Sequence, residues 1–439
     1  MSERGVFNGR RGFIIATAAS AVGLGNIWRF PTEAAMHGGG TFVLIYIFIV
    51  LIFGLVMMVT EIAIGRKTRK SPIEAYTELH PKARIIGILS SWVPAIILPY
   101  YCVIGGWLIA YLCGYCVGTD MTGASYFTDF AGSYEAVAAF AVFAVFTAIV
   151  VYLGVGKGVE KFSLIFMPIF LVLLVALVIY CATLPSASDG IAYYFGFHLQ
   201  DVDASTFTAA LGQAFFSLSI AMGILITYGS YFNKEESIER CSISIILIDT
   251  AVAIIAGMLI IPMAYVYAPD AMTHGGAGLV FMTLPKIFAE IPAGQVVALI
   301  FFAMVLFAAI TSAVSVLEAV SSTVIDSFKK DRTKAVTIVM IPTFIAGALI
   351  SLGYGPLDYI TIDGKNLLDL FDYVSNTLMM PIVAFLCCIF VGHIIGTKVI
   401  QEEIQYEMPF VGKYLYPLMI KWVCPILVAI IFVSSFISF

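Results

Sequence analysis

The sequence predicts an all-α polytopic membrane protein. Of its 439 residues, 61% are hydrophobic and 12% are charged, whereas soluble globular proteins contain roughly 45–50% apolar and about 25% charged residues. Apolar runs of about 20 residues, the length that crosses a hydrocarbon core, recur along the whole chain. These observations exclude a soluble enzyme, a nucleic-acid-binding module and a disordered scaffold. Membrane lipid is an expected partner, and nucleic acid is not.

Breaks at polar residues, proline and glycine divide the apolar sequence into eleven expected spans. Their expected ranges are 11–36, 41–67, 86–117, 135–154, 159–183, 206–231, 240–267, 294–325, 334–353, 366–395 and 414–438. The loops between them are short, so residues 1–439 are expected to form a single transmembrane domain. The first span is too long for a cleavable signal peptide.

The distribution of basic residues predicts the orientation. Most of the 23 Lys and Arg residues fall in alternate loops, beginning with Arg4, Arg10 and Arg11 before the first span. Because cytoplasmic loops are enriched in Lys and Arg, the N-terminus is expected in the cytoplasm. An odd number of spans then places Phe439 outside.

Motifs for covalent chemistry are absent from the sequence. There is no Walker A run and no HExxH motif, and the five histidines lack metal-ligand spacing. Cys113 and Cys116 form a CxxC pair at the outer end of the third span, outside any thioredoxin-like context. The sequence therefore predicts neither an enzyme nor an organic cofactor.

The first span contains glycines and polar residues in its middle. Gly23 and Gly25 are followed at once by Asn26 and Arg29. Two interpretations are open, since glycines allow helices to pack closely, whereas an unwound helix exposes backbone groups that bind a ligand. A packing face does not need the asparagine and arginine, so the unwound interpretation is favoured.

The sixth span has a comparable polar interval that includes Gln213, Ser217 and Ser219 but only one glycine, Gly223. The serines could instead hydrogen-bond to their own helix. The first and sixth spans, however, begin two successive five-span halves. Interruptions at matching places in two halves indicate the central site of a transporter.

Further polar residues lie at membrane depth in the seventh and eighth spans. Asp249 is an intramembrane acid, which indicates a functional site, with a structural hydrogen bond as the alternative. Thr311 and Ser312 lie in the middle of the eighth span. Their hydroxyls suit a hard cation such as Na⁺, which prefers oxygen ligands.

At this point the residues support a resemblance to a known family. The segment Ala21-Val22-Gly23-Leu24-Gly25-Asn26-Ile27-Trp28-Arg29-Phe30-Pro31, followed by His37-Gly38-Gly39-Gly40, resembles the first-helix signature of the neurotransmitter:sodium symporters. The later segments that match the same family in order are Phe216-Ser217-Leu218-Ser219, Ile226-Thr227-Tyr228 and Thr311-Ser312. The match runs from about Arg4 to Asp372 and is similar to bacterial members with 11 spans.

The resemblance implies the leucine-transporter fold, in which two five-helix repeats are inverted relative to each other. The repeats would occupy about 1–183 and 206–395, with an extra eleventh helix at about 414–438. Spans 1 and 6 would be unwound at the midplane. The implied location is the bacterial cytoplasmic (inner) membrane.

The resemblance also implies two Na⁺ sites. The first would use the Ala21 carbonyl, Asn26, Ser217, Asp249 and the substrate carboxylate. The second would use the carbonyls of Ala19, Val22 and Ala308 with the hydroxyls of Thr311 and Ser312.

An L-amino acid is the implied substrate. Monoamine-transporting relatives carry Asp at the position of Gly23, and its absence here leaves no acid to replace a missing substrate carboxylate. The mostly apolar pocket favours Trp, Tyr, Phe or Leu as the substrate. Within this group, Ser315 gives a weak preference for a side chain with a hydroxyl or an indole N–H. The implied pocket residues are Ala21, Gly23, Leu24, Gly25, Ile97, Tyr101, Phe216, Ser217, Ser219, Met222, Ser312, Ser315 and Val316.

Asp249 departs from many relatives, which carry Asn at this position. Chloride-dependent members bind Cl⁻ near the positions of Tyr46, Gln213, Ser217 and Asp249. A fixed carboxylate here would supply the same negative charge. The sequence therefore predicts chloride-independent transport, with Asp249 a candidate proton site on the empty return step.

Gates and a hinge are also implied. Arg29 and Asp372 would close the outer path, with Phe216 covering the substrate. Arg4 and Asp326 would close the inner path, with Phe7 and Tyr231 nearby; alternatively, Arg4 is only a topology-setting charge. Gly158 and Pro168 match the family's unwinding motif in the fifth span.

The predicted function is sodium-coupled symport of hydrophobic or aromatic L-amino acids by alternating access. Two alternatives remain: a proton-coupled amino-acid transporter of the same fold, and an amino-acid sensor that does not transport. The hydroxyls of Thr311 and Ser312 favour Na⁺ over protons alone. The presence of two gate pairs argues against a pure sensor.

Overall fold

The computed structural model describes residues 5–123, 125–269, 276–406 and 408–437. This part of the chain is built from helices and contains isolated β-bridges but no strand. Nine of its helical segments are long and apolar enough to cross a membrane. They span Gly40–Thr68, Pro81–Val117, Tyr134–Tyr152, Val155–Ala182, Ile238–Tyr267, Gly294–Phe328, Arg332–Leu352, Leu367–Ile394 and Tyr416–Phe436.

Two further expected spans are broken helices. The first consists of α1 (Gly9–Ala21) and the pair η1 (Gly25–Arg29) and α2 (Phe30–Met36), bent by 55° at the break. The other consists of α11 (Ala204–Ser217) and α12 (Ile224–Ser230). In the described part of the chain, length and composition thus identify nine spans, or ten with the bent pair, and α11 and α12 occupy the remaining expected range. The predicted fold class is confirmed.

The first half of the chain contains several short helices beside its spans. Its remaining elements are α3 (Gly40–Ile49), η2 (Val50–Gly54), α4 (Leu55–Thr68), α5 (Pro72–Leu79), η3 (Pro81–Ala83), α6 (Arg84–Val117), α7 (Tyr126–Ala131), α8 (Tyr134–Tyr152), η4 (Val155–Glu160), α9 (Lys161–Ala182), α10 (Ala187–Phe195) and η5 (Leu199–Asp201).

The second half continues the same pattern. After α12 it contains α13 (Ile238–Tyr267), η7 (Leu279–Thr283), α14 (Leu284–Glu290), α15 (Gly294–Phe328), α16 (Arg332–Leu352), α17 (Leu367–Asp372), η8 (Tyr373–Met379), α18 (Met380–Ile389), η9 (Phe390–Ile394), α19 (Thr397–Ile404), η10 (Val411–Tyr414), α20 (Tyr416–Leu418), η11 (Met419–Val423) and α21 (Cys424–Ile437). The short helices α5, α7, α10, α14 and α19 fall in segments that the sequence assigns to loops.

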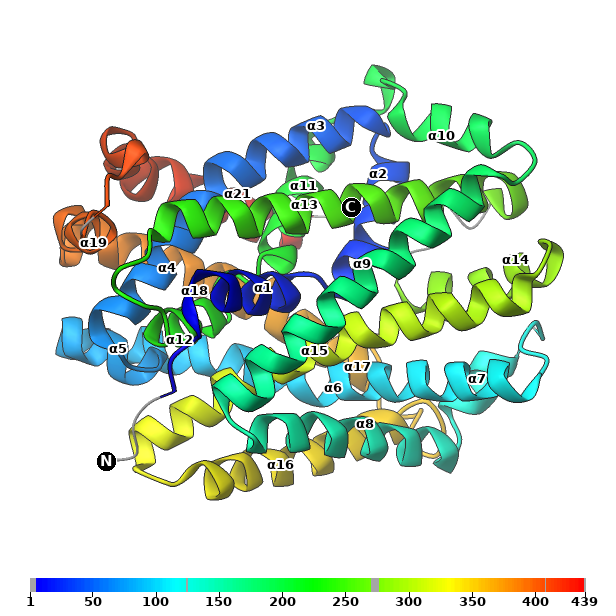
Figure 1. The fold of residues 1–439 in the computed structure, drawn as a ribbon, viewed down its shortest axis with the longest axis horizontal. Helices are drawn as coiled ribbons and strands as arrows, with labels where there is room; N and C mark the ends of the chain where they lie inside the picture. The colour runs from blue at the N-terminus through cyan, green and yellow to red at the C-terminus, as the bar shows by residue number, and fades with distance from the viewer. Residues whose placement is uncertain (1–4, 124, 270–275, 407, 438–439) are drawn as a thin grey trace.

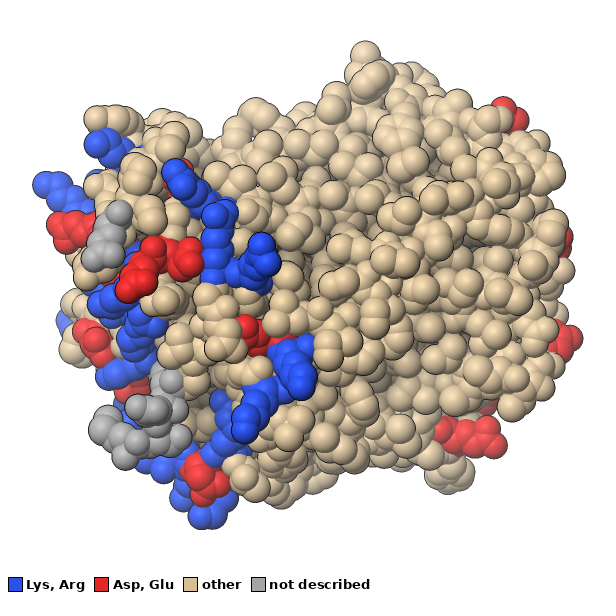
Figure 2. Space-filling model, viewed as in Figure 1, with Lys and Arg blue, Asp and Glu red and all other residues tan. Residues whose placement is uncertain are grey.

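The long helices run along one common direction in Figure 1, and α15 packs against α6 near the centre. Helix α6 also packs on α8, and α12 packs on α4. The basic side chains gather at one end of the molecule, as Figure 2 shows, and α5, α12 and α19 lie at the same end in Figure 1. We call this end the basic end; α7, α10 and α14 lie at the opposite end.

Glycines bring α4 and α12 into close contact. A Cβ atom on Gly65 would lie 1.9 Å from the Ile226 carbonyl oxygen, and one on Gly229 would lie 2.4 Å from the Ile62 carbonyl oxygen. Membrane helices associate through this kind of small-residue packing, because the lipid offers no hydrophobic driving force between them. The half of the sixth span nearer the basic end, α12, is therefore held directly against α4.

Replacing Gly65 with Ala is expected to destabilise the protein. The added methyl group meets backbone of α12, which cannot turn aside as a side chain would, and overpacking of this kind costs about 1–3 kcal/mol. The thermal midpoint of the purified protein should fall in a melting assay that follows the folded fraction. Gly278→Ala is the matched control, since nothing lies within 4 Å of the added atom. Equal midpoints for the two variants would contradict the prediction.

Candidate functional site

The break in the first span exposes backbone groups that other elements contact. Helix α1 ends at Ala21, and Val22 is extended, with φ −68° and ψ 108°. The Ser312 hydroxyl on α15 lies 3.2 Å from the carbonyl oxygens of both Ser20 and Val22, and the Gly23 N–H donates to the Asn26 side chain over 3.0 Å. The unwound interpretation of this span is therefore confirmed, and polar side chains compensate for the lost helical hydrogen bonds.

The sixth span is interrupted over residues 218–223. Ser219, Ala221 and Gly223 all have positive φ, at 53°, 65° and 68°. Left-handed backbone is costly for a residue with a Cβ atom, so the surrounding structure must stabilise it. Glu61 on α4 does so, since its Oε1 accepts the Ala221 N–H at 2.8 Å.

Asp249 on α13 lies between the two broken spans and is fully buried. Its Oδ1 accepts a hydrogen bond from the Asn26 amide at 2.8 Å, and its Oδ2 accepts one from the Ser217 hydroxyl at 2.7 Å. The Tyr46 hydroxyl lies 3.5 Å from the same Oδ2. The structure thus brings together the side chains expected at the first Na⁺ site.

The arrangement of this cluster fits a small cation. Asn26 directs its amide nitrogen to Asp249, so its oxygen would have to turn from Gly23 to a bound ion. Gln213 donates to the Gly25 carbonyl at 3.2 Å, while its own buried oxygen has no hydrogen-bond partner in the described chain. The cluster thus offers several oxygens around a carboxylate that carries the negative charge.

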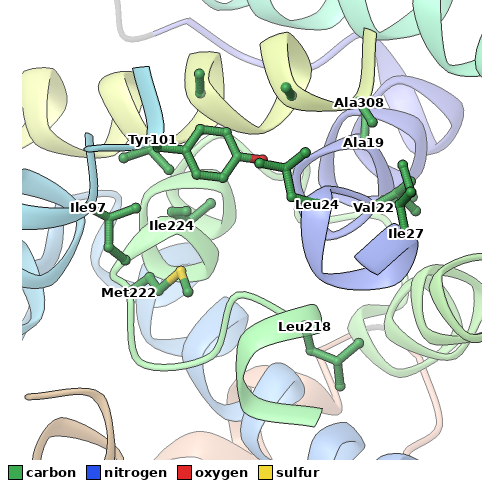
Figure 3. Close-up of a cluster of buried hydrophobic side chains, with 14 of the residues drawn as sticks. Ala19, Val22, Leu24, Ile27, Ile97, Tyr101, Leu218, Met222, Ile224 and Ala308 are labelled. Atoms are coloured by element: carbon green, nitrogen blue, oxygen red, sulfur yellow. The ribbon is translucent and has the colours of Figure 1, made fainter. Parts of the chain in front are cut away.

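The residues expected at the second Na⁺ site also lie together. Ser312 reaches the Val22 carbonyl, and Thr311 donates to the Ala308 carbonyl at 3.0 Å. Figure 3 shows Ala19, Val22 and Ala308 close to one another where α1 meets α15. Hydroxyl and carbonyl oxygens are the ligands that a hard cation prefers.

Several of the apolar residues expected to line the substrate pocket form a buried cluster beside the two breaks. Ile97, Tyr101 and Met222 lie on one side of Leu24 in Figure 3, with the Tyr101 hydroxyl directed toward Leu24. That hydroxyl is buried and has no hydrogen-bond partner among the described residues. A buried hydroxyl donor beside the start of a helix can bind a carboxylate.

The other expected pocket residues also have defined places. Val316 is buried on α15, while the Ser315 hydroxyl donates to the Thr311 carbonyl at 3.0 Å and accepts from Tyr228 at 2.7 Å. The Phe216 ring packs on Gly25, where a Cβ atom would lie 2.6 Å from the ring. Because Ser315 already has two partners, the weak preference for a polar substrate group is less well supported.

A cavity of ≈ 1470 Å³ lies beside this cluster and is lined by residues of both broken spans. Leu24, Tyr101 and Phe216 line it, together with Arg29 and Asp372. The expected ion pair between Arg29 and Asp372 is not formed among the described residues. Arg29 instead lies 3.6 Å from Glu33, and Asp372 accepts from Asn376 at 2.6 Å.

Aromatic and charged side chains pack together on the side of the site that faces the basic end. Phe7 packs edge-on against Tyr228 and Tyr231, with ring centroids 5.4 Å and 6.0 Å away. The Tyr231 hydroxyl donates to Glu318 at 2.8 Å, and Arg332 contacts the same carboxylate at 2.6 Å and 3.0 Å. These contacts lie between the cluster and the basic end, and none of the residues that make them lines the cavity.

The expected inner gate is described in part. Arg4 lies outside the described residues, and Asp326 accepts the Ser71 N–H at 2.7 Å.

In the expected hinge, Gly158 lies in the π-helical turn η4, where a Cβ atom would meet the Val150 carbonyl oxygen at 2.0 Å. Helix α9 continues through Pro168. The unwinding of this span stays a prediction for the state in which the inner path is open.

Sequence reasoning missed two charged contacts. Glu33, the partner of Arg29, lies one helical turn after it, and this i, i+4 spacing was a usable signal. Arg332, the partner of Glu318, follows a Lys-rich loop, and nothing in the sequence separates it from the other basic residues there.

Comparisons with known proteins agree with this geometry. The sequence matches the sodium:neurotransmitter symporter family over residues 4–122 and 128–439. The uncharacterized sodium-dependent transporter YhdH of Bacillus subtilis is 32% identical, with 96% of each chain covered. The sodium- and chloride-dependent GABA transporter 2 of Homo sapiens is 23% identical, covering 92% of this chain and 75% of that protein.

Among solved structures, the crystal structure of MhsT in complex with L-phenylalanine superposes with a TM-score of 0.89. The two sequences are 34% identical, and the match covers 98% of this chain and 100% of that chain. Two broken spans, a polar cluster between them and a family match over nearly the whole length lead to one conclusion. This chain belongs to the sodium:neurotransmitter symporter family and is a sodium-dependent symporter with the leucine-transporter fold.

Proposed function

We propose that the protein transports hydrophobic or aromatic L-amino acids together with Na⁺, independently of chloride. The observation that carries this proposal is the buried Asp249 carboxylate, which accepts hydrogen bonds from both broken spans beside an apolar pocket. Substrate and Na⁺ bind at the midplane, and alternating access exposes them to each side in turn.

An amino acid suits the two ends of the pocket. The amides of Leu24 and Gly25 begin the outer half of the first span, where a helix N-terminus favours a carboxylate. The unpaired Tyr101 hydroxyl lies beside them. Gly23 leaves no space for an acidic side chain, because a Cβ atom would lie 2.9 Å from the Ser312 hydroxyl. MhsT, with its bound L-phenylalanine, supports the same class of substrate.

The composition of the pocket favours a large apolar side chain. Ile97, Met222 and Val316 are all buried. Tyr, Trp, Phe and Leu are the candidates, and broad specificity is expected, since an apolar pocket discriminates weakly against one methylene or hydroxyl group. Met222 supports this breadth because a thioether adapts to ligands of irregular shape.

Charge balance supports transport without chloride. Two Na⁺ ions and a zwitterionic substrate bring a charge of +2 to the midplane, and an ionised Asp249 lowers it to +1. Net charge at this depth is costly. A carboxylate fixed by Asn26 and Ser217 therefore supplies the anion that chloride-dependent relatives take from solution.

The distribution of basic residues supports an orientation in the bacterial cytoplasmic membrane. Figure 2 shows Lys and Arg at one end, which the positive-inside rule assigns to the cytoplasm. The N-terminus is then cytoplasmic and the C-terminus external. On this assignment the cavity opens outward and the contacts around Glu318 close the cytoplasmic path.

Substrate binding is expected to require Na⁺ but not chloride. Labelled Phe, Trp, Tyr and Leu should bind saturably to the purified protein in Na⁺ gluconate, and binding should fall by at least about tenfold in K⁺. Loss of a buried charged partner costs more than the 1.4 kcal/mol that corresponds to tenfold. Binding that is indifferent to Na⁺ would favour the proton-coupled alternative. Binding without uptake into proteoliposomes would favour the sensor.

Asp249→Asn is expected to make binding depend on chloride. The amide has a similar shape but no charge, so chloride should restore Na⁺-dependent binding that gluconate does not support. Asp120→Asn is the control, since this acid lies on the surface. A variant that binds equally in chloride and gluconate would contradict the role given to Asp249.

Met222→Phe is expected to change the preference among substrates. The ring takes up space at the distal end of the pocket, so affinity for Trp should fall relative to Leu by about 1–3 kcal/mol, the usual effect of overpacking. Met222→Leu nearly conserves volume and should leave the ratio within about 1.5 kcal/mol of its original value. Competition binding measures both ratios, and unchanged selectivity in Met222→Phe would place Met222 outside the substrate pocket.

A further inference from the structure

Three charged or titratable side chains lie in a row on the outer half of the first span. Arg29, Glu33 and His37 are spaced four residues apart, so they share one face. The Arg29 Nε atom lies 3.6 Å from one oxygen of the Glu33 carboxylate, and the His37 Nε2 atom lies 3.4 Å from the other. Glu33 is thus shared between the gate arginine and a histidine.

Two carboxylates are within reach of Arg29. Glu33 contacts it now, and Asp372, which lines the same cavity from another helix, is near enough to interact electrostatically with Arg29 while it accepts from Asn376 at 2.6 Å. The guanidinium lies over the Phe216 ring, 5.8 Å from its centroid. Moving Arg29 from Glu33 to Asp372 would join the two walls of the cavity above the pocket.

His37 also connects the outer halves of the two broken spans. Its Nδ1 atom lies 3.5 Å from the Thr206 hydroxyl on α11, and its ring stacks on Phe42 of α3. Among the described residues, the charged groups that face it are Glu33 on its own helix and Asp203 at the start of α11. Hydrogen bonds from Ser205 and Thr206 hold the pKa of Asp203 below its usual value, which keeps this acid ionised.

We propose that Glu33 is a positioning residue for the outer gate: it holds Arg29 away from Asp372, and protonation of His37 releases Arg29 to Asp372. A proton on His37 adds a positive charge 3.4 Å from Glu33. This charge competes with Arg29 for the carboxylate and repels the guanidinium toward the opposite wall. Low external pH therefore closes the outer path. The inference rests on the proposed role of Arg29 and Asp372 as the outer gate.

The test measures access to the cavity rather than transport. Cys113 and Cys116, the two exposed cysteines of the described chain, are replaced by Ser. Thr377, which lines the cavity deeper along the span than Asp372, is replaced by Cys. A membrane-impermeant thiosulfonate reagent then labels the full chain in nanodiscs, without Na⁺ or amino acid, between about pH 5.5 and 8, where His changes its charge.

Comparing variants at equal pH cancels the reactivity of the thiol itself. The background variant carries only the three substitutions above. At about pH 5.5 its cysteine should be labelled about two- to fivefold more slowly than when His37→Asn is added, the range that a half-exposed ion pair supports. At about pH 8 the two should label equally. With Glu33→Gln, labelling should be slow at both pH values, and with Glu33→Asp the labelling rate should be partly restored. His198→Asn, a histidine that contacts Tyr193 instead, should retain the background behaviour.

Equal labelling of the background and His37→Asn at both pH values would overturn the proposal, as would fast labelling of Glu33→Gln. Slowing at low pH that persists in Asp372→Asn would also overturn it, because Arg29 would then be moving elsewhere. The labelling assay needs neither Na⁺ nor substrate. Absence of amino-acid uptake with the expected labelling pattern would therefore refute the proposed function and leave this inference standing.

Discussion

The Asp249 carboxylate connects the two interrupted spans to an unbroken one, and the central site depends on this connection. Asn26 follows the first break and Ser217 precedes the second, and each donates to a different oxygen of the same carboxylate. A charge at this depth is expensive unless it is fully hydrogen-bonded or paired with an ion. Asn26 and Ser217 therefore stabilise the Asp249 carboxylate, and the carboxylate in turn holds both side chains in place.

The same constraint explains the surroundings of each break. Backbone groups released from a helix in a membrane must find partners within the protein. Ser312 contacts two carbonyls at the first break, and Glu61 accepts the Ala221 N–H at the second. These partners come from α15 and α4, so the breaks are stabilised by helices that are themselves continuous.

The two breaks differ in how clearly the sequence indicates them. The first contains two glycines followed by Asn26 and Arg29, and glycine lowers helix stability in a recognisable way. The second depends on left-handed backbone at Ser219 and Ala221, residue types that do not indicate it. The stabilising contact comes from Glu61, which is 160 residues away in the chain. Local sequence therefore indicates the first break, whereas the second is a consequence of tertiary structure and was supported mainly by its position in the chain.

Span positions were predictable from local hydrophobic patterns, and Asn26, Asp249 and Thr311 were indicated as polar residues at membrane depth. The rest of the expected site came from the resemblance to the family. The sequence did not predict which charged side chains pair with one another. Arg29 contacts Glu33 within its own helix rather than Asp372 across the cavity, because the cavity separates the two walls in this conformation. A pattern of residues specifies which groups are available, but the conformational state decides which of them meet.

The two ends of the transport path are closed by different kinds of contact, and this difference bears on the cycle. At the end opposite the basic end, which the proposed orientation places outside, Arg29 is 37% exposed and Glu33 is 21% exposed. Solvent therefore screens their attraction, and little free energy opposes a change of partner. At the basic end Glu318 is fully buried and contacts Arg332 and Tyr231, with Phe7 packed beside it. Arg332 is 25% exposed, but separating it from Glu318 would leave a buried carboxylate without its partner, which is costly. Opening the basic end therefore requires more free energy than closing the outer end. In the proposed function, the binding of Na⁺ and substrate at the central site supplies this free energy, because both broken spans contact that site.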